Sequence, residues 1–320
     1  MARHVDVAEL VDRAREGQPR AVARLISLVE DEAPQLRAVA AALAPLTGRA
    51  RVLGITGPPG AGKSTSTSAL VSAYRERGAR VGVLAVDPSS PFSGGALLGD
   101  RIRMSDHATD PGVFIRSMAT RGHLGGMAAA TPQALRVLDA AGFDVVIIET
   151  VGVGQSEVDV VRLADTTLVL LAPGMGDGIQ AAKAGILEVA DVFVVNKADR
   201  DGAEATVNDL KYMISLGRKE IRGPSWRQPI VRTIATKAEG IPELLDAIDA
   251  HASWMTDHGE LEGRRTHRAA TEVEAIAVAG LRARLGSVHG GDALDQLAKR
   301  VVAGELDPYA AADQLIDQLG

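Results

Sequence analysis

The sequence predicts an α/β protein in which a mainly parallel central sheet is flanked by helices. Between about residues 51 and 237, short apolar runs rich in β-branched residues alternate with helix-like segments. This alternation is typical of a parallel sheet whose strands are buried on both faces. A glycine-rich turn joins the first apolar run to the first of these helices, and the two ends of the chain have helical periodicity only.

Three regions are expected along the chain. Residues 1–46 form an N-terminal helical region with two weak proline breaks, and residues 47–258 form the sheet domain. Residues 259–320 form a C-terminal helical region, in which 266–286 and 292–319 have the helical pattern. Because neither end carries a strand pattern, we expect both helical regions to cover exposed surface or to form a subunit interface.

Seven apolar runs are predicted to be strands. Segments such as 131–142 and 179–190 lie between them and have apolar residues at three- and four-residue spacing. In an open parallel sheet, ligands bind beyond the carboxyl ends of the strands, and each motif described below lies at such an end. The runs are 51–57, 80–87, 113–118, 143–150, 166–173, 192–199 and 229–235.

Composition and charge exclude several classes of protein. The net charge of −6 gives no basic face for nucleic acid, and the absence of cysteine excludes disulfides and thiolate metal sites. Charges interrupt the N-terminus every few residues, unlike a signal peptide. The apolar runs are much shorter than the ~20 residues of a membrane-spanning helix. We therefore expect a cytoplasmic protein that binds neither nucleic acid nor membrane.

The turn after the first strand has the spacing GxxxxGK[ST], which predicts a P-loop NTPase. Its glycines let successive backbone N–H groups converge on phosphates, and the helix N-terminus adds a partial positive charge. Lys63 is expected to reach the β- and γ-phosphates, and the Ser64 hydroxyl to bind Mg²⁺. The loop comprises Gly57, Pro58, Pro59, Gly60, Ala61, Gly62, Lys63, Ser64 and Thr65.

Acidic residues near the ends of predicted strands indicate where the magnesium ion binds. Asp87 ends the run 80–87, Asp100 lies shortly after it, and Glu149 is near the end of 143–150. Mg²⁺ prefers hard oxygen ligands, usually one or two carboxylates with waters and phosphate oxygens. We therefore expect Ser64, Asp87, Asp100 and Glu149 to form a metal-centred group.

The sequence NKAD, at residues 196–199, predicts that the base is guanine. Guanine presents two adjacent donors that the Asp199 carboxylate can accept, whereas adenine offers no such pair. Sites built to hydrogen-bond such groups discriminate by roughly 10⁴-fold or more. Lys197 is expected to lie along the base and Asn196 to tie this turn to the phosphate loop. Backbone N–H groups of three further residues are expected to close over guanine: Ala235, Thr236 and Lys237.

The sequence ETVG, at residues 149–152, favours a nucleotide switch. The Gly152 N–H is positioned to sense the γ-phosphate, so hydrolysis would release the loop that follows. In Ras-like proteins a glutamine after this glycine orients the attacking water. Val153 occupies that position here, and Gln155 is two residues further on. We expect slow intrinsic hydrolysis that a partner accelerates.

Six ordered blocks of the sequence resemble one family of GTPases, the MeaB/ArgK/MMAA family of SIMIBI-class P-loop G proteins. They are GPPGAGKST, VDPSSPFSGGALLGDRIRM, RSMATRGHLGG, ETVGVGQSEVDV, LLAPGMGDGIQAAKAG and VNKAD. The resemblance implies a GTP-hydrolysing chaperone of adenosylcobalamin-dependent methylmalonyl-CoA mutase. Such a protein would gate cofactor delivery, protect the mutase from inactivation, and form a homodimer through its C-terminal helices.

The same resemblance implies roles for individual residues. It places Asp87 and Asp100 in the metal and switch I region, and Glu149 in switch II. Segment 173–185 resembles a further switch that communicates with the mutase. This segment has four glycines in thirteen residues, which would allow it to rearrange. Its charged residues are Asp177 and Lys183.

Two other functions are weighed against this one. A P-loop kinase or ATPase linked to the transport of basic amino acids, such as arginine and ornithine, would share the phosphate loop but has no need of the guanine-reading NKAD. A nickel-insertion GTPase typically needs a histidine- or cysteine-rich site. This chain has no cysteine and seven scattered histidines.

Overall fold

The structure is a computed structural model, and it describes residues 6–31, 33–87, 105–107, 109–119, 130–150, 162–175, 189–217, 225–288 and 293–317. The chain divides into two compact units, Met1–Glu262 and Gly263–Gly320. Among the described residues, no helix combines the length and apolar character that crossing a bilayer would require.

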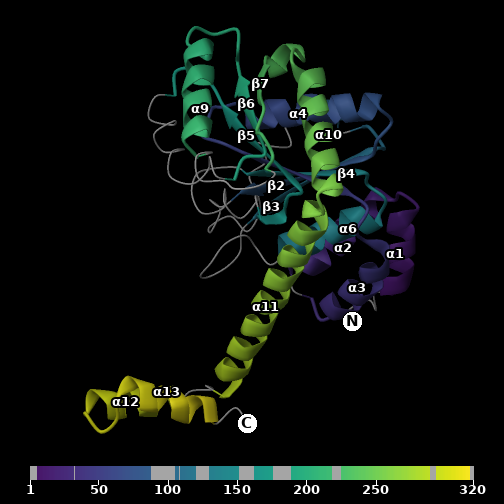
Figure 1. Cartoon of the computed structure of the whole chain (residues 1–320). Helices are drawn as coiled ribbons and strands as arrows, with labels where there is room; N and C mark the ends of the chain where they lie inside the picture. Colours follow the sequence, from purple (N-terminus) through teal and green to yellow (C-terminus); the bar gives the residue numbers. More distant parts are fainter. Residues whose placement is uncertain are drawn as a thin grey trace. The chain divides into compact units, whose positions relative to one another are not determined.

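A seven-stranded sheet forms the centre of the first unit (Figure 1). The strand order is β3-β2-β4-β1-β5-β6-β7, and every pair is parallel. All seven apolar runs predicted from the sequence form strands, so the predicted fold class is confirmed. The strands are β1 (Arg51–Thr56), β2 (Val81–Asp87), β3 (Val113–Ala119), β4 (Val145–Thr150), β5 (Thr166–Leu171), β6 (Val192–Asn196) and β7 (Ile230–Thr233).

Helices cover both faces of the sheet, because alternate side chains of each strand point to opposite faces. In β5, Leu168 and Leu170 pack with the helices of one face, whereas Val169 and Leu171 pack with those of the other. The first face carries α4 (Lys63–Glu76) and α10 (Ile241–Asp257), and the second carries α6 (Ala130–Ala140) and α9 (Ala203–Gly217).

The N-terminal helices share a hydrophobic core with the sheet. Side chains of α1 (Val7–Arg15), α2 (Pro19–Glu30) and α3 (Leu36–Leu43) form one buried cluster with α6, β2 and β4. Figure 1 shows these helices grouped beside α6. An ion pair between Arg116 of β3 and Glu30 of α2 adds a polar link. The N-terminal region therefore packs as part of the first unit.

The described residues of the second unit form helices joined by a turn at 303–307. The long helix α11 (Glu260–Val288) begins in the first unit and continues into the second, and α12 (Ala293–Val302) and α13 (Pro308–Asp317) follow it. The last two helices contact each other, and Leu297 and Ala311 are buried in this unit.

The strand order predicts where on the sheet a ligand binds. From β1 the chain runs to β2 and β3 on one side, and β5, β6 and β7 lie on the other side of β1. A crevice forms beyond the carboxyl ends of strands where the order reverses in this way. The phosphate loop follows β1, Glu149 lies in the adjacent β4, and NKAD begins at the last residue of β6.

Candidate nucleotide site

The phosphate loop joins β1 to the N-terminus of α4. Three of its glycines have positive φ angles: 140° at Gly57, 81° at Gly60 and 94° at Gly62. Gly62 is the N-cap of α4, and the first helical hydrogen bond runs from the Ser66 N–H to the Gly62 carbonyl. The first N–H groups of an α-helix have no acceptor within the helix, so the N-terminus of α4 is suited to bind an anion beside the loop.

Two of these glycines also lie against neighbouring groups. A Cβ atom at Gly57 would collide with the backbone carbonyl of Leu170 in β5. A Cβ at Gly62 would collide with the side-chain amide of Asn196. The loop is thus held close to β5 and to the turn after β6, and only glycine fits at these two positions without rearrangement.

The Lys63 side chain folds back along the phosphate loop. It is only 8% exposed, and its ammonium group donates to the Gly57 carbonyl at 2.5 Å and to the Pro58 carbonyl at 3.4 Å. A nearly buried cation needs nearby negative or partially negative groups. The lysine therefore brings its charge to the loop that is predicted to hold the phosphates.

Glu149 is connected to α4 by two hydrogen bonds. The residue is 1% exposed, and it lies in β4 between β2 and β1, next to Ala85 and Ile55. The Ser64 hydroxyl donates to Oε1 at 2.6 Å, and the Thr67 hydroxyl donates to Oε2 at 2.8 Å. Hydroxyl and carboxylate oxygens are the ligand types that Mg²⁺ prefers, so this corner of the site suits a magnesium ion.

Asn196 connects the NKAD turn to the phosphate loop. Its side-chain N–H donates to the Ala61 carbonyl at 2.9 Å. Its side-chain oxygen accepts from the Ala235 N–H at 3.1 Å and from the Thr233 hydroxyl at 3.2 Å. One buried amide thus links three segments: the phosphate loop, the end of β6 and the turn after β7.

The rest of NKAD extends from this junction toward the surface. Lys197 has a φ of 57°, and its ammonium group donates to the Gly60 carbonyl at 2.7 Å. The Asp199 carboxylate lies 4.0 Å from the Lys237 ammonium, and both side chains are about half exposed. Asp199 is therefore accessible to a base.

The turn after β7 contains the three residues predicted to close over guanine, and they form the short helix η4 (Ala235–Lys237). The Ala235 N–H donates to the Asn196 side chain, and the Lys237 N–H donates to the Ile234 carbonyl at 2.8 Å. These two N–H groups already have partners within the protein, which leaves fewer donors for a base.

Several predicted site residues cannot be placed. Asp87 ends β2, but its side chain lies outside the described residues. The remaining ones lie wholly outside them: Asp100, Gly152, Asp177 and Lys183. Their predicted roles in the metal site and in the switches remain predictions.

A second set of contacts joins α4 to the chain that precedes β3. The short helix η2 (Ser105–His107) brings a His107 ring nitrogen to 3.1 Å from the Ser68 hydroxyl. Asp110 accepts from Arg75 at 2.8 Å and from the Gly112 N–H at 2.8 Å. Both hydrogen bonds lower the pKa of Asp110, and the one from the Arg75 side chain has the larger effect.

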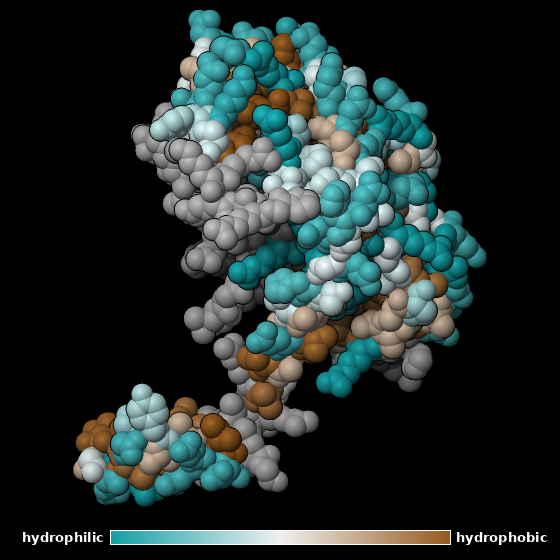
Figure 2. All heavy atoms as spheres, viewed as in Figure 1, coloured by the Kyte–Doolittle hydropathy of each residue, from teal (hydrophilic) through white to brown (hydrophobic). Residues whose placement is uncertain are grey.

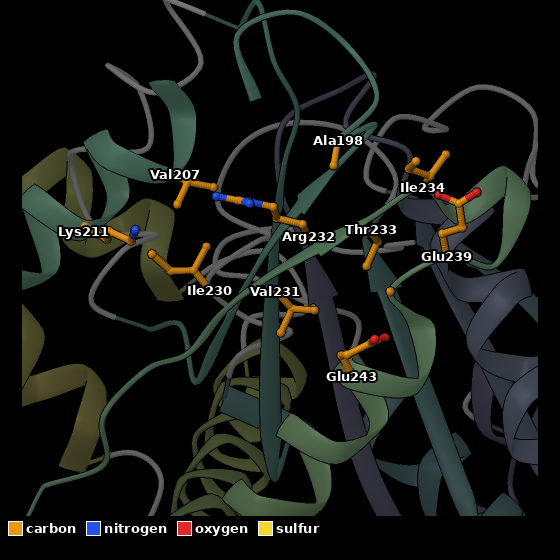
Figure 3. Close-up of a pocket in the computed structure, with 11 residues that line it drawn as sticks. Ala198, Val207, Lys211, Ile230, Val231, Arg232, Thr233, Ile234, Glu239 and Glu243 are labelled. Atoms are coloured by element: carbon orange, nitrogen blue, oxygen red, sulfur yellow. The ribbon is translucent and has the colours of Figure 1, made fainter. Parts of the chain in front are cut away.

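A surface hollow of about 600 Å³ lies beside the NKAD turn, along β7 at the edge of the sheet. Figure 3 shows the Arg232 side chain extending toward Val207, with the carboxylates of Glu239 and Glu243 on the opposite side. Ala198 of NKAD also lines the hollow. Gly240 lies so close to the Arg232 carbonyl that an added Cβ would collide with it. The chain at Gly240 therefore covers part of β7, which is an edge strand of the sheet.

The structure adds one site residue that sequence reasoning missed. Thr67 holds Glu149, yet its position lies outside the GxxxxGK[ST] pattern. The sequence contains one indirect signal, because five consecutive hydroxyl residues, 64–68, begin the helix after the loop. Serine and threonine are poor helix formers, so such a run suggests that some of these hydroxyls form hydrogen bonds or bind a ligand.

Comparison with known proteins identifies relatives along nearly the whole chain. A family model described as Methylmalonyl Co-A mutase-associated GTPase MeaB matches residues 22–288. A Pyrococcus abyssi protein named as a GTPase is 48% identical over 314 residues, which cover 98% of this chain and 97% of that protein. A Mus musculus protein named methylmalonic aciduria type A homolog, mitochondrial, is 37% identical over 275 residues, which cover 85% of this chain and 65% of that protein. A solved structure described as LAO/AO transport system kinase matches with a TM-score of 0.73 and 29% identity over 99% of both chains.

Proposed function

The chain belongs to the MeaB family of methylmalonyl-CoA mutase-associated GTPases, and from this premise we propose that it is a chaperone of a methylmalonyl-CoA mutase. It hydrolyses GTP, as its family does. We propose that the nucleotide state gates delivery of adenosylcobalamin and protects the mutase from inactivation. The observation that carries the proposal is the hydrogen bond from Asn196 to Ala61, because it couples the base turn to the phosphate loop.

Binding of GTP or GDP would use both the phosphate loop and the NKAD turn. The curled backbone of the phosphate loop and the N-terminus of α4 offer N–H groups to the phosphates, and Lys63 neutralises their charge. Asp199, which is half exposed, accepts hydrogen bonds from guanine. These roles agree with the buried lysine and the accessible carboxylate, and they exclude adenine on chemical grounds.

A magnesium ion would be held by Ser64, Asp87, Asp100 and Glu149. The buried pair of Ser64 and Glu149 supplies a hydroxyl and a carboxylate oxygen 2.6 Å apart, which is a donor set that Mg²⁺ accepts. When bound, the ion neutralises phosphate charge. Glu149 also begins the segment ETVG, so the residue that faces the metal is directly connected to the predicted switch.

Intrinsic hydrolysis is proposed to be slow, because Val153 stands where Ras-like proteins have the water-orienting glutamine. A partner would then accelerate it. A single-turnover assay of the purified protein tests this point, and turnover of many per second without a partner contradicts it.

The mutase is the proposed partner. The name of the mouse relative and the description of the family model support this choice. Segment 173–185, with Asp177 and Lys183, is proposed to carry the nucleotide state to the mutase. Its glycines would allow a change of conformation when the nucleotide changes.

A homodimer is proposed to form through the C-terminal helices. In α11, Val273, Ile276 and Leu281 are each more than half exposed, and Figure 2 shows further apolar residues on the surface of the hairpin formed by α12 and α13. Exposed apolar residues gathered on helices mark interaction surfaces. Light scattering of the purified chain gives its mass in solution and tests this proposal directly.

Co-purification tests the proposed function as a whole. The full chain is mixed with an adenosylcobalamin-dependent methylmalonyl-CoA mutase in the presence of GDP or of a non-hydrolysable GTP analogue. We expect a complex whose amount, or whose effect on cofactor loading, depends on the nucleotide. A chain that hydrolyses GTP but neither binds the mutase nor alters its loading would remove the chaperone role and leave the GTPase.

A kinase remains the second candidate, because the solved relative is described as a transport system kinase. Products distinguish the two functions. The chaperone converts GTP into GDP and phosphate only, whereas a kinase transfers the phosphoryl group to an acceptor. Incubation with labelled GTP and basic amino acids, including arginine and ornithine, would reveal a phosphorylated product.

A further inference from the structure

Thr67 is a fully buried hydroxyl residue in the second turn of α4. Its exposed fraction is 0%, and its hydroxyl lies 2.8 Å from Oε2 of Glu149 and 3.0 Å from the Lys63 carbonyl. A hydroxyl has one hydrogen to donate. A carboxylate is a stronger acceptor than a neutral carbonyl, so the hydrogen is directed mainly toward Glu149.

Ser64 and Thr67 restrain Glu149 at both of its oxygens. They are three residues apart on one helix and therefore lie on the same side of it, where Ser64 reaches Oε1 and Thr67 reaches Oε2. The terminal torsion of a glutamate side chain is broad and soft. A contact on each of the two oxygens restrains this rotation more than a contact on one oxygen would.

The two hydroxyls differ in what they are expected to bind. Ser64 follows the P-loop lysine and is a predicted magnesium ligand. Its oxygen would therefore bind the ion, while its hydroxyl hydrogen is donated to Glu149. Thr67 lies one turn deeper and has the Glu149 carboxylate and the Lys63 carbonyl as its partners. Its contact with Oε2 is therefore independent of the nucleotide phosphates.

We infer that Thr67 is a positioning residue for the magnesium site: its hydroxyl holds the Glu149 carboxylate in the orientation that the metal requires. This inference rests on the proposed GTP and magnesium binding. Residues that orient metal ligands commonly change metal affinity by about 10- to 100-fold when they are removed. The same contact fixes the end of β4, where the predicted switch segment begins, to the helix that follows the phosphate loop.

Magnesium dependence of nucleotide release tests this role without any measurement of hydrolysis. The full chain is loaded with a fluorescent GDP, and its dissociation rate is followed while the magnesium concentration is varied. Three variants are compared with the wild type: Thr67→Val, which removes the hydroxyl and keeps the shape; Thr67→Ser, which restores the hydroxyl; and Thr167→Val. Thr167 is also fully buried, but its hydroxyl has no partner among the described residues, so it is a matched control.

For Thr67→Val, we expect the magnesium midpoint to rise about tenfold or more, while GDP affinity at saturating magnesium changes little. Thr67→Ser and Thr167→Val should keep the wild-type midpoint. A purely structural role would instead lower the melting temperature and weaken GDP binding at every magnesium concentration, and that outcome overturns the inference.

Two further outcomes separate this inference from the proposed function. If Thr67→Val has the wild-type midpoint while the wild type shows magnesium-dependent release, only the role of Thr67 is wrong. If the wild type shows no magnesium-dependent binding of guanine nucleotide, the proposed function fails, and the role of Thr67 fails with it. Should Thr67→Val not fold, Thr67→Ala and the melting curve of Thr67→Ser provide the same comparison.

Discussion

The side-chain amide of Asn196 donates a 2.9 Å hydrogen bond to the backbone carbonyl of Ala61, which is 135 residues earlier in the chain. This bond connects the turn that is predicted to read the base with the loop that is predicted to hold the phosphates. Because the Asn196 oxygen also accepts from Ala235 and Thr233, the two loops and the turn after β7 have one common anchor.

Replacing Asn196 should therefore weaken nucleotide binding and stability together. Asn196→Ala leaves the Ala61 carbonyl and the Ala235 N–H without this partner at a buried position. An unsatisfied buried group lowers the free energy of unfolding by about 1–3 kcal/mol, and the loss of the link between the two loops should also lower GDP affinity, by roughly tenfold, which is about 1.4 kcal/mol. Fluorescence titration with GDP measures the loss. Asn208→Ala, an exposed position in α9, is the control, and equal affinity in both variants would show that the anchor is unimportant for binding.

Asp199 is predicted to determine the choice of base. Asp199→Asn replaces an acceptor by a donor, which suits the carbonyl of xanthine where guanine has an amine. We expect GTP affinity to fall by roughly 10-fold or more, with a relative gain for xanthosine triphosphate. Competition titrations with GTP, xanthosine triphosphate and ATP measure the shift. Asp201→Asn changes an exposed acid two residues away and should leave the preference for guanine unchanged.

Lys63 is predicted to distinguish triphosphate from diphosphate. Lys63→Ala removes a nearly buried ammonium group at the phosphate loop, so hydrolysis should be lost and GTP binding should weaken more than GDP binding. Calorimetry with GDP and a non-hydrolysable GTP analogue measures the two affinities. The matched control is Lys211→Ala, an exposed lysine in α9. Hydrolysis at the wild-type rate would mean that the loop has been misassigned.

Local patterns were sufficient to predict the strands and the two nucleotide loops. The seven strands are continuous apolar runs, and the bend at Gly57–Gly62 needs glycine wherever φ is positive. The strand order is not encoded in such runs, because a strand buried on both faces has the same composition beside any neighbour. The sequence also gives helical periodicity to α1, α2 and α3 without showing that they share a core with α6.

Contacts between distant residues account for what was missed at the site. Thr67 and Glu149 are 82 residues apart, and no spacing rule connects them. The same holds at the amino ends of β5 and β6, where the buried ring of His251 lies 2.9 Å from the Thr166 hydroxyl and 3.3 Å from Asp191. Neither motif nor periodicity predicts such pairs, because they form only when the strands and helices have packed.

Gly57 should tolerate alanine less well than Gly60. Both have positive φ angles, which cost an L-residue about 1–2 kcal/mol. At Gly57 the added Cβ would also meet the Leu170 carbonyl, a backbone atom in a buried strand, whereas at Gly60 its nearest neighbour is the flexible Met175 side chain at 3.7 Å. Urea unfolding of Gly57→Ala and Gly60→Ala measures the difference. A smaller loss of stability for Gly57→Ala would contradict the close approach.

Asp110 should make stability depend on acid pH. Its hydrogen bonds from Arg75 and from the Gly112 N–H lower its pKa below the ordinary value of 3.8. As the pH falls, the unfolded chain therefore binds a proton at this position before the folded chain does. The stabilisation is fully present above about pH 5 and decreases as the pH passes through 3.8 toward the lower folded pKa.

Unfolding measured at several pH values tests this contribution. Asp110→Asn should be less stable than the wild type near neutral pH, and the difference in free energy of unfolding should shrink as the pH is lowered through the aspartate range. Asp106→Asn, at an exposed acid in η2, serves as the neighbouring control and should keep the wild-type pH dependence. A constant difference between Asp110→Asn and the wild type at all pH values would show that the negative charge of Asp110 does not stabilise the fold.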